Sequence, residues 1–311
     1  MEFFKQNTNI NFMGQRKWTA FLSVILCTCS IVALAWHGLT WGLDFTGGTQ
    51  IQVHYVEAAD LAQMQADLEE AGFADASVVS FGTSKDVLIS LMHKKANTEA
   101  DEKAQTETVQ AVLTALPGAV MDQVNYIGPQ VGSEMVTKGL LAIIVALLGT
   151  MIYIAVRFDM RFAIGSTVAL IHDPIIILGV FSFFHIEFNL IALAAVLTVI
   201  GYSLNDTIVI FDRVRENFKK FRKLEAIDVM NQSINQTLSR TIMTSALTLI
   251  VILALFFLGG SLLHGFALAL MIGIVVGTYS SIYVAGSLTL ALGLNRYHLV
   301  PVVKEIDERN P

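Results

Sequence analysis

The sequence predicts an α-helical integral membrane protein with six transmembrane helices and one small α+β domain outside the membrane. Of its 311 residues, 54% are hydrophobic and only 15% are charged, whereas soluble domains carry about 25% charged residues. The apolar residues also gather in blocks long enough to cross a bilayer, which requires about 20 residues in a helix. The predicted spans are residues 18–36, 139–156, 162–184, 188–211, 241–258 and 265–292.

The first predicted span, 18–36, lacks the features of a cleaved secretory signal. It starts too far into the chain and is too long, and the sequence WHGLTWGLDF that follows offers no small-residue cleavage site. We therefore expect this helix to be retained.

The distribution of Lys and Arg predicts the orientation of the chain, because cytoplasmic segments of membrane proteins are enriched in these residues. Fifteen of the 20 basic residues lie in the termini (1–17 and 293–311), in the short 157–161 turn and in the 212–240 loop. We therefore expect both termini and the 212–240 loop to be cytoplasmic. Residues 37–138 then form a domain on the outer side of the membrane.

Within the outer segment, hydrophobic patterns of strand and helix type follow each other in the order β-α-β-β-α-β. This is the order of a ferredoxin-like fold. The predicted strands are 49–56, 76–82, 86–93 and 119–128, and the predicted helices are 58–73 and 99–118. The pattern contains no catalytic constellation and suits binding or mechanical movement.

Charge and cysteine content exclude two classes of function for the outer domain. It holds 14 acidic and five basic residues, whereas a nucleic-acid partner would require a basic surface. The two cysteines, Cys27 and Cys29, both lie in the first predicted span. We therefore expect neither a disulfide framework nor a metal site.

Two carboxylates, Asp173 and Asp206, lie within predicted spans, where an ionisable side chain is costly and by default marks a functional site. An aspartate removed from water binds a proton more readily, and a nearby guanidinium weakens that binding. Movement of Arg240 relative to Asp206 would therefore form a two-state proton switch. The candidate proton pathway comprises Asp206, Arg240, Asn205, Tyr202, Thr244 and Asp173.

Each of these features also has a purely structural interpretation. Asp206 and Arg240 could form a static ion pair that only joins two helices, and Asp173 could cap or bridge helices. Pro174 removes a helix hydrogen bond beside Asp173, which favours a kink. A stripe of small residues on the sixth span favours close helix contact, and it comprises Gly273, Gly277, Ser281 and Ala285.

The cytoplasmic loop contains a segment, 215–240, that begins basic and then places Ile227, Ile234 and Leu238 on one helical face. This pattern predicts an amphipathic helix at the inner membrane surface. A simple basic anchor explains it equally well.

Two stretches, WGLDFTGGT (41–49) and GYSLNDTIVIFDRVREN (201–217), resemble the SecF family. Members of this family are the smaller membrane subunits of the SecDF protein-export complex, in the resistance–nodulation–division superfamily. HDPIIILG (172–179) and TLSRTIMTSALTL (237–249) also match the family, and the resemblance covers nearly the whole chain. Pro174 departs from the aliphatic residue expected there, so the role of Asp173 stays open.

The resemblance implies a non-enzymatic subunit of the bacterial inner membrane that works with SecD and uses the proton-motive force to drive late preprotein translocation. It implies SecYEG, YajC, unfolded preprotein and membrane lipid as partners, and no nucleic acid. Asp206 and Arg240 fall on the family's proton-pathway positions. No cofactor is implied besides the proton gradient, and coupling to Na⁺ stays open. The family motif after the first span comprises Gly42, Asp44, Phe45, Gly47 and Gly48.

Three other functions would also account for parts of the sequence. A half-transporter of the same superfamily would share the proton site but export small molecules or lipids. An intramembrane aspartyl protease would use Asp173 and Asp206 as a catalytic pair, although neither the Gly-x-Gly-Asp nor the Tyr-Asp signature occurs around them. A purely structural assembly factor would need neither Asp206 nor Arg240.

Overall fold

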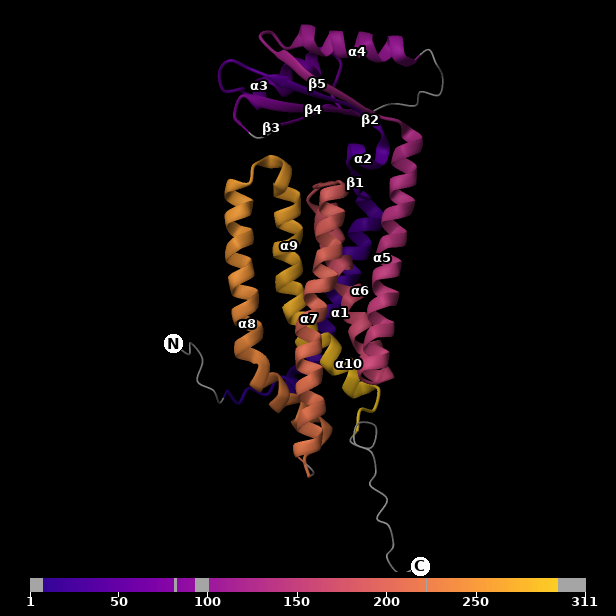
Figure 1. Ribbon diagram of the computed structural model, residues 1–311, viewed down its shortest axis with the longest axis vertical. Helices are drawn as coiled ribbons and strands as arrows, with labels where there is room; N and C mark the ends of the chain where they lie inside the picture. The colour runs from indigo at the N-terminus through magenta and orange to yellow at the C-terminus, as the bar shows by residue number, and fades with distance from the viewer. Residues whose placement is uncertain (1–7, 81–82, 93–100, 222, 296–311) are drawn as a thin grey trace, which may run out of the picture.

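The structure is a computed structural model, and it describes residues 8–80, 83–92, 101–221 and 223–295. Long helices run side by side and form a bundle, and a small sheet domain lies beyond one end of it (Figure 1). Six helices are long and apolar enough to cross a membrane. The predicted fold class is thus confirmed. The outer parts of the predicted cytoplasmic termini, 1–7 and 296–311, lie outside the described residues.

Most ends of the six long helices lie beyond the predicted spans, although α6 ends one residue before its predicted end and α7 begins two residues after its predicted start. They are α1 (Arg16–His37), α5 (Pro129–Arg157), α6 (Met160–Phe183), α7 (Leu190–Lys220), α8 (Ala226–Leu258) and α9 (Ser261–Ser280). The last helix continues through a π-helical turn, η2 (Ser281–Ala285), into α10 (Gly286–Ala291). The segment predicted as a separate amphipathic helix thus divides between the end of α7 and the first turns of α8, which enter the span without a break.

The centre of the bundle is formed by α6 and α7, which are the most buried of the six helices. The helix α6 remains continuous through Pro174. On the sixth span, the small-residue stripe lies against α7: a Cβ atom on Gly273 would collide with Val199, and one on Gly277 would lie 3.0 Å from the Cβ of Ser203. Glycine therefore permits this close helix contact, as the sequence predicts.

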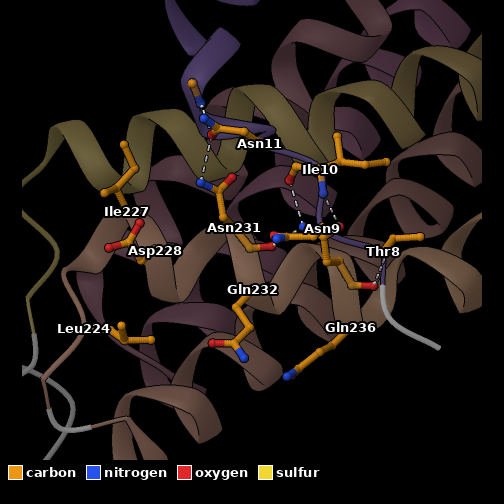
Figure 2. A pocket seen from close by; sticks show the side chains of 12 residues that line it. Thr8, Asn9, Ile10, Asn11, Leu224, Ile227, Asp228, Asn231, Gln232 and Gln236 are labelled. Carbon is orange, nitrogen blue, oxygen red and sulfur yellow. Dashed lines mark hydrogen bonds between the residues drawn. The ribbon is translucent and has the colours of Figure 1, made fainter.

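The chain before α1 is fixed to the beginning of α8 by side-chain amides (Figure 2). Asn235 accepts a hydrogen bond from the backbone N–H of Ile10 (2.9 Å) and donates one to its carbonyl (2.8 Å). Asn231 accepts from the N–H of Met13 at 2.8 Å. A hollow of about 760 Å³ remains beside these contacts. The amides satisfy backbone groups that precede a span, and they tie the first and fifth spans together at one end.

The outer domain is a four-stranded antiparallel sheet with two helices. Its elements are β2 (Gly48–His54), α3 (Leu61–Glu70), β3 (Ser77–Ser80), β4 (Asp86–Met92), α4 (Asp101–Ala115) and β5 (Val120–Ile127). The strand order is β3-β4-β2-β5, with Ile51 opposite Ile89. Ile51, Ile89, Leu68 and Val112 are buried between the sheet and the helices. The element order and the sheet order are those of the predicted ferredoxin-like arrangement.

Candidate functional site

The glycine-rich motif after the first span forms the junction between the outer domain and the bundle. A short strand, β1 (Thr40–Trp41), pairs in parallel with β6 (Glu187–Phe188) in the turn between α6 and α7. One turn of helix, α2 (Leu43–Thr46), follows and leads into β2. The ring of Phe45 stacks on that of Phe188, with centroids 5.9 Å apart. The motif thus connects the sheet to the point where two central helices meet.

Close backbone contacts explain the glycines of this junction. A Cβ on Gly42 would lie 2.7 Å from the Glu187 carboxylate, and one on Gly132, in the first turn of α5, would lie 2.6 Å from the carbonyl oxygen of Phe45. Gly47 and Gly48 both have positive φ values, 75° and 153°. Residues other than glycine rarely adopt such values, because their Cβ atom clashes with the backbone.

The carboxylate of Asp44 caps the beginning of α7. Its Oδ2 accepts a hydrogen bond from the backbone N–H of Leu190, the first residue of that helix, at 2.9 Å. A negative charge at this end is favourable, because the first N–H groups of a helix have no partner within the helix. Asp44 therefore links the outer motif directly to the helix that carries Asp206.

Glu187 lies beside this cap and is partly buried. Burial raises the pKa of its carboxyl group, and the nearby negative charge of Asp44 raises it further. A raised pKa in the folded protein means that the ionised form weakens the fold. The penalty is absent below the unfolded-state pKa and grows as pH rises through the folded-state pKa.

We expect Glu187→Gln to raise the melting temperature of the purified chain at pH 7.5 and to leave it unchanged near pH 4. The glutamine mimics the protonated acid, so it removes the penalty only where Glu187 would be ionised. The exposed Glu57 offers a matched control, since Glu57→Gln should change neither value. An equal gain for Glu187→Gln at both pH values would contradict the assignment.

A buried polar network surrounds Asp173 in the middle of the bundle. The Asp173 side chain is fully buried, and its Oδ2 accepts hydrogen bonds from Ser203 on α7 (2.7 Å) and Ser280 on α9 (2.9 Å). Its Oδ1 lies 3.0 Å from Nδ1 of His172. The carboxylate thus has partners from three helices, as a buried charge requires.

The network continues through Thr207 and Ser281, towards the end of the bundle away from the sheet domain (Figure 1). Thr207 donates a hydrogen bond to Ser281 Oγ at 2.9 Å, and Ser281 can donate to the carbonyl of Gly277 at 2.8 Å. Ser281 is the first residue of the π-helical turn. A π-turn widens the helix locally and often marks a functional site.

Two substitutions at Asp173 separate a structural role from a proton-carrying role. Asp173→Asn keeps an acceptor for the two serines and offers an N–H to His172, so we expect stability within about 1 kcal/mol of wild type. Asp173→Leu leaves three polar partners unpaired, which costs about 2 kcal/mol or more at roughly 0.6 kcal/mol per hydrogen bond plus desolvation. Unfolding of the full chain in mixed micelles measures both, and equal stability of Asp173→Leu and wild type would contradict the network's role.

Asp206 lies on α7, about one turn after Ser203, and its surroundings differ from those of Asp173. Its side chain is only 3% exposed, and its Oδ2 is buried without a hydrogen-bond partner among the described residues. Arg240 lies on α8, which packs against α7. No ion pair within 4.0 Å joins these two side chains in the described part of the chain. The static ion pair considered from the sequence is therefore not formed here.

Of the other predicted pathway residues, Tyr202 and Asn205 lie on α7, and Thr244 and Arg240 lie on α8. The Tyr202 hydroxyl donates a hydrogen bond to Thr248 at 3.4 Å, and Thr244 donates to backbone carbonyls of its own helix. Asn205 is exposed, as is Arg240. An exposed polar face therefore runs along the centre of a spanning helix, which is unfavourable against lipid.

Asp173 and Asp206 do not form a catalytic pair. Both carboxylates are described, and no hydrogen bond joins them, whereas two aspartates that share a proton must be in direct contact. Asp173 is instead bonded to His172, Ser203 and Ser280. The geometry thus contradicts the intramembrane aspartyl protease.

Sequence reasoning missed part of the site. Ser203, Thr207 and Ser280 are not among the predicted site residues, because single hydroxyls within spans usually bond to their own helix. Glu187 lies between two predicted spans, where a carboxylate is unremarkable in the sequence, yet it borders the Asp44 cap. The spacing of Ser203 and Thr207, one turn apart on the α7 face towards α6 and α9, was the available signal.

Comparisons with known proteins agree with this geometry. Residues 104–295 match the family described as protein export membrane protein SecD/SecF, C-terminal, and residues 32–59 match the SecD/SecF GG motif. The protein translocase subunit SecF of Vibrio alginolyticus is 47% identical over 298 residues, which cover 96% of this chain and 94% of that protein. The subunit of the same name from Pseudomonas aeruginosa is 46% identical, with 94% of each chain covered.

Solved structures show the same architecture. The crystal structure of SecDF from Thermus thermophilus, a translocon-associated membrane protein, superposes with a TM-score of 0.78 at 36% identity. A super-membrane-facing form of SecDF gives a TM-score of 0.70, also at 36% identity. The first match covers 93% of this chain but only 39% of the SecDF chain. This chain therefore spans about two fifths of the length of those SecDF chains.

The family models cover most of the chain, and the curated relatives match it almost from end to end. With six candidate spans, it is a multi-pass membrane protein. The chain belongs to the SecF family of protein translocase subunits.

Proposed function

We propose that this protein uses the proton-motive force, together with SecD, to drive late preprotein translocation at the outer face of the bacterial inner membrane. In this proposal Asp206 binds and releases the proton, and Arg240 is its movable counter-charge. Tyr202, Asn205 and Thr244 supply polar groups along the route. Asp173 holds α6, α7 and α9 together.

The observation that supports this proposal most is the state of the Asp206 carboxylate. It is buried within a span, one of its oxygens lacks a hydrogen-bond partner among the described residues, and no ion pair joins it to Arg240 on the neighbouring helix. A proton would neutralise this buried carboxylate, and closer approach of Arg240 would favour the ionised form and expel the proton. One charge that crosses the membrane potential releases about 2.3 kcal/mol per 100 mV, enough to bias two states more than tenfold.

The cap on α7 offers a route from the proton site to the outer domain. The same helix carries Asp206 and the backbone N–H that Asp44 binds. A shift of α7 on protonation would therefore pull directly on α2 and on the sheet that follows it. The outer domain contacts the bundle at this junction through Gly42, Phe45 and Gly132. The backbones are so close there that a Cβ atom on either glycine would collide with a neighbour.

The exposed polar face of α7 and α8 supports a second membrane half as partner. Thr198, Gly201 and Asn205 follow helical spacing on α7 and are all exposed. SecD would cover this face, since the SecDF chains extend well beyond the part that this chain matches. We further propose cytoplasmic termini, and contact with SecYEG, YajC, unfolded preprotein and lipid.

The test uses proteoliposomes that contain the chain together with SecD and SecYEG. We expect an imposed proton gradient to increase the export of a preprotein that is already halfway across, and a protonophore to abolish the increase. Omission of this chain should have the same effect as the protonophore. Export that responds to the gradient equally well without the chain would refute the proposal, and a matching sodium gradient decides between H⁺ and Na⁺.

A further inference from the structure

The structure contains a pocket in the lateral surface of the helical bundle. It has a volume of about 470 Å³ and lies between α1, α6 and the η2–α10 segment. Ala20, Cys27, His172, Tyr283 and Ala291 are among the residues that line it. This volume is within the usual range of small-molecule sites.

The pocket opens towards the lipid side of the bundle. Three of its apolar lining residues, Val24, Val168 and Ile171, are 63%, 42% and 42% exposed. Its lining on α1 runs from Ala20 to Thr28, a length of about 12 Å at about 1.5 Å per residue. One leaflet of a bilayer contributes roughly 15 Å of hydrocarbon. The length of the pocket along α1 is therefore close to the thickness of one leaflet, and its apolar lining suits a lipid acyl chain.

Basic side chains lie at the end of the pocket near the N-terminus of α1. Arg16 and Lys17 precede Ala20 by four and three residues, so they project from the same helical face. Trp18, the residue directly after them, is 78% exposed, as expected for an aromatic anchor at the membrane interface.

A third cation lies beside the α10 wall of the pocket. Arg161, at the start of α6, donates a hydrogen bond to the carbonyl of Leu292 at 3.2 Å, next to the lining residue Ala291. Its guanidinium also pairs with Asp159 at 3.3 Å. With one acidic and three basic groups, this end of the pocket carries a net positive charge.

We propose that the pocket binds one anionic phospholipid of the leaflet that surrounds the N-terminal end of α1. An acyl chain enters between α1 and α10, and the headgroup phosphate lies among Arg16, Lys17 and Arg161. Basic pockets between transmembrane helices recognise anionic headgroups in this way. All residues of this lipid site come from this chain, so lipid binding requires neither a partner subunit nor the proton site.

The lipid also has a structural consequence for the Asp173 network. His172 forms part of the pocket wall, and its Nδ1 lies 3.0 Å from the Asp173 carboxylate. Its Nε2 is buried without a partner among the described residues. Hydrocarbon in the pocket keeps water away from this wall and therefore keeps the network dry.

Native mass spectrometry of the full chain in detergent tests the proposal, with added phosphatidylglycerol and, separately, phosphatidylcholine as probes. We expect one phosphatidylglycerol to remain bound and phosphatidylcholine to dissociate. Arg16→Gln/Lys17→Gln should weaken phosphatidylglycerol binding about 30-fold, from the usual contribution of each basic residue. The double variant Lys219→Gln/Lys220→Gln removes the same charge from the end of α7 and should bind like wild type.

Two pocket-filling variants, Ala20→Trp and Ala291→Trp, come from opposite walls and should each abolish the bound lipid. Ala142→Trp, on the exposed surface of α5, is the matched control and should retain it. The proposal is overturned if both filled variants keep phosphatidylglycerol as wild type does. It is equally overturned if phosphatidylcholine is held as tightly, or if the Lys219/Lys220 control loses as much affinity as the Arg16/Lys17 variant.

Discussion

Asp206→Asn will reduce gradient-driven export to the level seen with a protonophore, while the protein still folds and assembles with its partner. Asparagine has nearly the same size and fits the same space, but it cannot bind and release a proton. Without the Asp206 carboxylate, the proposed switch has no group that can bind the proton. We therefore expect a loss of about 100-fold or more in the gradient-driven export rate, in keeping with the loss of an essential proton-transfer group.

The control for this variant lies on the same helix. Asp212 is exposed and its carboxylate is 3.5 Å from Arg157, so Asp212→Asn removes an equal charge at the membrane surface. We expect its export rate to be within twofold of wild type, because exposed ion pairs contribute about 0–1 kcal/mol. Export by Asp206→Asn at the wild-type rate would remove Asp206 from the proton route.

Gly48→Ala will disrupt the junction between the outer domain and the bundle. Gly48 has a φ of 153°, and a Cβ there would collide with the carbonyl oxygen of Leu91 in the paired strand β4. Neither backbone can move without breaking the β2–β4 ladder. Strain and overpacking together should cost about 3 kcal/mol or more.

Hydrogen exchange of β2 and β4 amides in the full chain measures this effect. A loss of about 3 kcal/mol corresponds to roughly 100-fold faster exchange through local opening. Gly72 also has a positive φ, 92°, but nothing lies within 4 Å of its Cβ position. Gly72→Ala should therefore cost only about 1–2 kcal/mol of backbone strain, and equal exchange in the two variants would show that the contact with Leu91 is unimportant.

The helices and the outer domain could be predicted from the sequence because both depend on local patterns. Apolar blocks of bilayer length locate the spans, and the alternation in 49–56 and 86–93 locates two paired strands. The small-residue stripe of Gly273 and Gly277 predicted a close helix contact, which the structure confirms. Asp206 was found because a carboxylate in an apolar run is conspicuous at any position along the helix.

The contacts between distant segments could not be predicted in the same way. The local sequence of the 41–49 motif does not indicate that Asp44 accepts a hydrogen bond from the N–H of Leu190, 146 residues away. The serines around Asp173 come from two other helices, and their convergence depends on how those helices pack. The beginning of α8 also differs from expectation, whereas its end at Leu258 is as predicted. A polar first half can continue an apolar span when its polar groups, such as Asn231 and Asn235, bind another segment.

The most direct test of the proton switch is infrared difference spectroscopy of the complex between high and low pH. We expect a carboxylic-acid C=O band to appear on acidification, to be absent in Asp206→Asn and to persist in Asp173→Asn. A band that disappears in Asp173→Asn and remains in Asp206→Asn would contradict the account, because the proton would then reside on the wrong aspartate.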